Sequence, residues 1–299
     1  MEVKSARKAY LFALLAVLFW STSPTAFKLG LRFIDTWQLL TGASLTSTIV
    51  LGILTVAQGK FRLLKSFSKK DLAFSALMGL LNPVAYYLIL FKAYTILPAQ
   101  VAQPLNMIWP IVLVLLAVPI LGQKVSWLSL GAMLLSFSGV VLISLMGGTV
   151  SQDPQNLLGI SLALSTSVVW AIYFLYNTRD KQDPYTRLFL NFAFASLFLL
   201  LAGIFRGQPL PDSAEGWFAA LYVGVFEMGV TFALWLMAIR LAPSSDRISN
   251  LVYMAPFLNL LFANQILGEK IYMTTVIGIV LLVTGIVIQN TSRRDAKQF

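Results

Sequence analysis

The chain of 299 residues contains no cysteine and no histidine. Without thiols it forms no disulfide, and without imidazole it has neither a His/Cys zinc site nor a histidine proton relay. It also lacks a GxxxxGK[ST] phosphate-binding loop, so we expect no ATP hydrolysis on this chain. These absences predict a protein that works with neither a metal nor another cofactor.

Charge is also scarce. Only 11% of the residues are charged and 58% are hydrophobic, whereas a soluble domain carries about 25% charged residues. The mean hydropathy is +0.79, and apolar runs of 18 or more residues recur along the chain, each long enough to cross a bilayer core of about 30 Å. The sequence therefore predicts an all-α membrane protein whose surroundings are the lipid bilayer.

The apolar runs predict ten transmembrane helices. The first run begins directly after MEVKSARK and has no small-residue cleavage site behind it, which favours an uncleaved helix over a signal peptide. The predicted spans are residues 9–28, 37–57, 72–92, 99–121, 126–146, 157–176, 186–205, 216–236, 246–266 and 271–290.

The basic residues predict which way these helices run. With the N-terminus in the cytoplasm, 17 of the 22 lysines and arginines fall in cytoplasmic segments. The positive-inside rule then places both termini in the cytoplasm. This bias also accounts for the net charge of +10, so no nucleic-acid partner is expected.

The two halves of the sequence resemble each other at an offset of about 145 residues. AYTILP (93–98) matches AIRLAP (238–243), and WPIVLVLLAVPILGQK (109–124) matches APFLNLLFANQILGEK (255–270). The predicted repeats are residues 1–147 and 157–299, with five helices each. An odd number of helices gives the repeats opposite orientations, the architecture in which transporters hold substrate near the membrane midplane.

These motifs resemble the EamA-type transporters of the drug/metabolite transporter superfamily, over essentially the whole chain. The resemblance rests on FWSTSPTAFK (19–28), ILGQK (120–124), VVWAIYF (168–174) and ILGEK (266–270). It implies a central cavity lined by the first, third, fourth, sixth, eighth and ninth helices, and export of small organic metabolites or drugs across the bacterial inner membrane. WST and IWP look most like the amino-acid exporters. Gln123 departs from the family's usual glutamate and Glu269 keeps it; we interpret both as loop structure.

Polar and aromatic side chains that share a helical face mark the expected cavity, because residues three and four apart are neighbours on a helix. The alternative is structural: serine, threonine and asparagine also join membrane helices, at roughly 0.6 kcal/mol each, and aromatic rings also pack. The predicted substrate-binding residues are Trp20, Asn82, Tyr86, Gln103, Asn106, Trp109, Trp170, Tyr173, Glu227, Thr231, Asn250 and Tyr253.

Glu227 differs from the other eleven acidic residues because it lies near the middle of a predicted span. A charge there costs roughly 2.5–3.5 kcal/mol, and no lysine or arginine lies at a similar depth. Two functional roles compete: a counter-ion for a cationic substrate group, or a proton-exchanging group that couples export to the proton gradient. The structural alternative is a protonated glutamate packed against an asparagine or a tyrosine.

The lack of deep cations also bears on the substrate. Sugar phosphates need such cations, so a neutral, zwitterionic or cationic small molecule is favoured, with aromatic rings available to it. We expect a transporter that works as a monomer. A polyspecific drug exporter and a channel or scaffold subunit are the alternatives, and an enzyme is disfavoured because no paired carboxylate or metal cluster is found.

Overall fold

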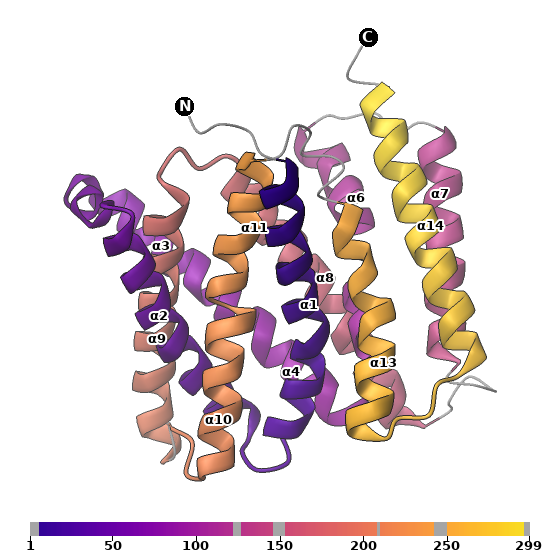
Figure 1. Cartoon of the computed structure of the whole chain (residues 1–299), viewed down its shortest axis with the longest axis horizontal. Helices are drawn as coiled ribbons and strands as arrows, with labels where there is room; N and C mark the ends of the chain where they lie inside the picture. The colour runs from indigo at the N-terminus through magenta and orange to yellow at the C-terminus, as the bar shows by residue number, and fades with distance from the viewer. Residues whose placement is uncertain (1–5, 122–126, 146–152, 208–209, 242–249, 296–299) are drawn as a thin grey trace. The chain divides into compact units, whose positions relative to one another are not determined.

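The computed structural model describes residues 6–121, 127–145, 153–207, 210–241 and 250–295 (Figure 1). Within these ranges every regular element is helical and no strand occurs. Six helical segments are long and apolar enough to cross a membrane, and residues 130–143, 251–267 and 273–288 form shorter apolar helices. The chain is therefore a multi-pass membrane protein, whereas the count of ten spans stays a prediction.

Six of the predicted spans coincide with continuous helices. They are the first, second, fifth, sixth, seventh and tenth. The corresponding helices are α1 (Ala6–Gly30), α2 (Thr36–Ala57), α7 (Trp127–Ser144), α8 (Pro154–Thr178), α9 (Pro184–Arg206) and α14 (Met273–Asp295).

The other four predicted spans are also helical but interrupted, and the third and eighth are still among the six long apolar segments. The third consists of α3 (Lys69–Gly79), the π-helical segment η2 (Leu80–Ala85) and α4 (Tyr86–Ile96). The eighth consists of α10 (Ala214–Tyr222), the π-helical segment η3 (Val223–Glu227) and α11 (Val230–Leu241). The fourth is split into α5 (Ala99–Asn106) and α6 (Trp109–Leu121). The ninth is seen as the 3-10 helix η4 (Asn250–Met254) and α13 (Ala255–Leu267), its start lying outside the described residues.

The helix beginnings follow from local sequence. Asp35 accepts a hydrogen bond from the backbone N–H of Gln38 at the start of α2, Asp183 caps α9 and Ser213 caps α10. Such caps satisfy backbone N–H groups that have no partner inside the helix. The start of α5 is capped from far along the chain, because Glu269 accepts from the backbone N–H of Ala99 at 2.7 Å. Glu269, expected to be loop structure, is therefore a helix cap.

The helices pack into two compact units. The first comprises Met1–Phe91 and Arg179–Ala255, and the second comprises Lys92–Thr178 and Pro256–Phe299. In the first unit α2 packs on α9 and α10, and α1 packs on α11; in the second, α7 and α14 run side by side (Figure 1). Each unit contains helices from both predicted repeats. The compact units and the predicted repeats are therefore two different divisions of the chain.

Candidate functional site

Glu227 is the last residue of the π-helical segment η3, which interrupts the eighth span. A π-helical turn adds one residue to the helix and leaves a break in the regular hydrogen-bond ladder, and such turns are frequent at functional sites. The break therefore places an acidic side chain where the helix is least regular. A prediction from hydrophobic periodicity treats the whole span as an α-helix, so it does not reveal the π-helical turn.

The Glu227 carboxyl group has polar neighbours on two other helices of its unit. Its Oε1 accepts a hydrogen bond from the Tyr87 hydroxyl of α4 at 3.0 Å, and the Ser23 hydroxyl of α1 is a second neighbour. The proton of Ser23 is already donated to the Phe19 carbonyl at 2.8 Å. Oε2 is buried without a geometrically good hydrogen bond within the described residues. The carboxyl group thus keeps unused capacity for a proton or a ligand.

Asn82 occupies the matching place in the first half of the chain. It lies in the π-helical segment η2, where its backbone leaves the helical region (φ −144°, ψ 117°), and the Asn82–Pro83 peptide bond is cis. The side chain is 1% exposed, and neither its Oδ1 nor its Nδ2 has a hydrogen-bond partner in the described part of the chain. Leaving a buried polar group unpaired costs about 1–3 kcal/mol, and Asn82, like Glu227, keeps hydrogen-bonding capacity that the described residues do not use.

Aromatic side chains pack between the first and the eighth helices of the first unit. Trp20 of α1 lies 5.3 Å from Trp235 and 6.1 Å from Phe232, ring centroid to centroid. The hydroxyls of Thr22 and Tyr222 lie 2.6 Å apart and join α1 to α10. The first helix is therefore held against the broken eighth helix by rings and a polar pair.

The second unit has its own polar and aromatic groups. Asn106, at the end of α5, donates to the Thr166 hydroxyl of α8 at 2.7 Å. The ring centroids of Trp109 and Phe174 are 5.6 Å apart, and those of Trp170 and Tyr173 are 5.7 Å apart. Asn106 therefore joins two helices, as the structural alternative allows.

The predicted site residues are divided between the two units. The first holds Trp20, Asn82, Tyr86, Glu227, Thr231, Asn250 and Tyr253, and the second holds Gln103, Asn106, Trp109, Trp170 and Tyr173. Gln103 and Tyr253 are both buried, at 4% and 8% exposed. The Asn250 side chain lies outside the described residues. Assembly of all twelve residues into one cavity stays a prediction.

Two details around the breaks differ from the sequence reading. Tyr87, five residues after Asn82, bonds to Glu227, whereas the predicted Tyr86 packs edge-on against Tyr87 at 4.7 Å. Thr231 is fully buried and donates to the carbonyl of Phe226, five residues earlier. The spacing of five between Phe226 and Thr231 fits the wider turn, and Tyr87 lies one residue beyond the spacing of four that selected Tyr86.

The model of the EamA-like transporter family matches residues 7–145 and 157–291. The chain belongs to this family. It is 28% identical over 97% of its length to an "Uncharacterized transporter" of Clostridium kluyveri, which it covers to 95%. It is 27% identical over 95% of its length to a "Probable terminal-alkyne amino-acid exporter" of Streptantibioticus cattleyicolor, which it covers to 93%.

The fold also matches a solved structure described only as "Crystal structure of protein". The TM-score is 0.68 at 20% sequence identity, over 98% of this chain and 99% of the other. This likeness concerns the fold alone. The family match identifies the chain as a transporter, which implies a membrane environment and a small-molecule substrate.

Proposed function

We propose that this transporter exports small organic metabolites, amino acids or related zwitterionic or cationic compounds, across the bacterial inner membrane by alternating access. The observation that carries the proposal is Glu227, a carboxyl group at a helix break whose polar neighbours among the described residues are Tyr87 and Ser23. No basic side chain pairs with it in the described part of the chain. It therefore exchanges a proton, binds a substrate cation, or does both in competition.

Reciprocal glycine contacts in the first unit support two structural repeats. A Cβ on Gly79 would collide with the backbone of Asn191, and one on Gly224 would lie 2.5 Å from the Thr46 Cβ. Gly224 follows Gly79 by 145 residues, and Asn191 follows Thr46 by the same number. Gly79 thus lies against Asn191, and the residues equivalent to these two, Gly224 and Thr46, lie against each other. A two-fold axis between the repeats produces such reciprocal contacts.

The second unit shows the same reciprocity between α7 and α14. A Cβ on Gly139 would meet Gly278 and Leu282, and one on Gly285 would meet Ala132 and Ser136. Each pair of equivalents is separated by 146 residues. With five helices in each repeat, a two-fold axis relating them lies in the membrane plane, which favours inverted repeats and alternating access.

The substrate class is inferred from the charges and from one relative. A carboxylate without a basic partner attracts an ammonium group, and the Trp20 and Trp235 rings near the eighth helix suit a cation or an apolar side chain. The relative from Streptantibioticus cattleyicolor carries the name of an amino-acid exporter. Its 27% identity supports the class of solute rather than a particular amino acid.

The test is efflux of labelled amino acids from proteoliposomes with and without an imposed pH gradient. We expect protein-dependent efflux that the gradient accelerates, and a loss of at least about tenfold in gradient-driven efflux in Glu227→Gln, which cannot exchange a proton. The control is Glu215→Gln, an exposed glutamate in the first turn of α10 on the same span. Fluxes equal to those of empty vesicles for every amino acid would refute the proposed function. Unchanged pH dependence in folded Glu227→Gln would leave Glu227 with a packing role only.

A further inference from the structure

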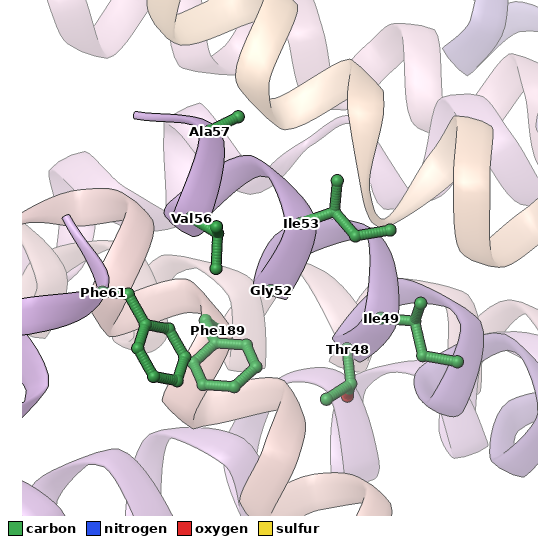
Figure 2. A pocket seen from close by; sticks show the side chains of 8 residues that line it. All are labelled: Thr48, Ile49, Gly52, Ile53, Val56, Ala57, Phe61 and Phe189. Atoms are coloured by element: carbon green, nitrogen blue, oxygen red, sulfur yellow. The ribbon is translucent and has the colours of Figure 1, made fainter. Parts of the chain in front are cut away.

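An apolar groove of about 550 Å³ lies in the first unit where the end of α2 approaches α9 and the 3-10 helix η1 (Phe61–Ser66). Figure 2 shows the rings of Phe61 and Phe189 beside one another, with the Val56 side chain of α2 close to them. The two ring centroids are 6.3 Å apart. The full lining is Thr48, Ile49, Gly52, Ile53, Val56, Ala57, Phe61 and Phe189.

Local sequence explains why this surface is hollow. Gly52 places no side chain over the Phe189 ring, and a Cβ there would approach the ring at 3.1 Å. Thr48 exposes no unpaired hydroxyl, because its Oγ1 bonds to the Ser44 carbonyl and to the Ser196 hydroxyl. A methylene group takes about as much space as a water molecule, roughly 30 Å³, so the groove has room for much of one hydrocarbon chain.

Phe61, which lines the groove, begins a short basic segment of the chain. In η1, Arg62 and Lys65 are both exposed, and residues three apart on a 3-10 helix lie one above the other. They are followed by exposed Lys69 and Lys70 at the start of α3. Lys60 is instead engaged with Asp183 at 2.6 Å and with the Tyr185 ring, which fixes η1 against α9.

We propose that this groove binds one acyl chain of an anionic phospholipid, with its phosphate held by Arg62 and Lys65. An apolar surface facing lipid is ordinary for a membrane protein. Here η1 supplies Phe61 to the groove and also carries the exposed Arg62 and Lys65, so one short helix offers groups for both parts of a phospholipid. The predicted cytoplasmic location of residues 58–71 agrees with this ligand, since anionic lipids of that leaflet attract basic segments beside the membrane.

Lipid binding can be measured by native mass spectrometry of the purified full chain with phosphatidylglycerol or phosphatidylcholine. We expect preferential retention of phosphatidylglycerol, with a reduction of roughly fivefold in affinity for each cation removed, hence about 25-fold in Arg62→Gln/Lys65→Gln. The matched control, Arg32→Gln/Lys92→Gln, removes two exposed cations elsewhere and should retain the lipid. Val56→Trp, which fills the groove at an exposed position, should also lose phosphatidylglycerol.

A further arm with inorganic phosphate separates the headgroup from the free anion. An excess of phosphate should not displace the lipid, because the acyl chain contributes most of the binding. Equal retention of both lipids, or full retention in Arg62→Gln/Lys65→Gln, would overturn the proposal. Displacement of phosphatidylglycerol by phosphate would also overturn it, and so would retention of phosphatidylglycerol by Val56→Trp. In either case the groove would not be the binding site. None of these outcomes depends on which solute is transported.

Discussion

Arg187 shows how one residue can join several segments of a membrane protein. Its side chain is 3% exposed and pairs with Asp180 and Asp71. It also donates to the Ser75 hydroxyl at 2.7 Å, and its guanidinium lies 5.0 Å from the ring of Phe67 and from that of Phe74. The planar, forked guanidinium makes all these contacts at once, which an ammonium group cannot do.

We therefore predict that Arg187→Lys lowers the free energy of unfolding although it keeps the charge. Each lost charge-assisted hydrogen bond is worth roughly 1.5–3 kcal/mol, so the melting temperature in detergent should fall by several degrees. The control is Arg32→Lys, at an exposed position near the end of α1. Equal melting temperatures for Arg187→Lys and the unaltered protein would show that charge alone matters at this position.

At the scale of elements, α7 and α14 pack closely because of glycines. A Cβ on Gly139 would lie 2.5 Å from the Gly278 carbonyl oxygen and 2.7 Å from the Leu282 nitrogen. Both obstacles are backbone atoms, so a side chain there forces the helices apart. Without a hydrophobic force between helices in lipid, the van der Waals packing that close approach allows contributes to their association, together with hydrogen bonds such as that from Ser136 to the Leu282 carbonyl.

Gly139→Ala should consequently destabilise the protein by about 1–3 kcal/mol, the usual cost of overpacking. The same helix offers a matched control in Gly131, where an added Cβ meets nothing within 4 Å. Gly131→Ala should be neutral or slightly stabilising, because alanine favours a helix by about 1 kcal/mol over glycine. Thermal unfolding in detergent decides the matter, and equal melting temperatures for the two variants would contradict close packing at Gly139.

The sequence predicts helices well but not their interruptions. Apolar length locates the six segments that are long and apolar enough to cross a membrane, because backbone groups in lipid must bond within a helix. The break at Asn82 has a visible signal in Pro83, which lacks a backbone N–H. The break before Glu227 contains no proline, and hydrophobic periodicity does not distinguish a π-helical turn in a uniformly apolar stretch.

The contacts that complete the site depend on the fold. Tyr87 reaches Glu227 across 140 residues, and Glu269 caps α5 from 170 residues away. Arg187, at the start of the predicted span 186–205, is buried in the structure. Residue type and depth identified Glu227 and Asn82 as candidates, whereas their partners follow only from how α1, α4 and the broken helices pack.

At the scale of the whole molecule, the proposed inverted repeats predict that equivalent loops lie on opposite sides of the membrane. Ser66 lies between the second and third spans, and Asp212, 146 residues later, lies between the seventh and eighth; both are exposed. The positive-inside count places residues around Ser66 in the cytoplasm. Five intervening spans place Asp212 outside.

The absence of cysteine makes this prediction direct to test. In Ser66→Cys and Asp212→Cys, the introduced thiol is the sole target of a membrane-impermeant maleimide. In intact cells Asp212→Cys should be labelled and Ser66→Cys protected, and disruption of the membrane should expose both. A matched pair within one repeat, Lys65→Cys and Ser66→Cys, should behave alike. Labelling of both loops from the same side would mean that the halves are inserted in the same sense, and the reciprocal contacts of Gly79 and Gly224 would then need another explanation.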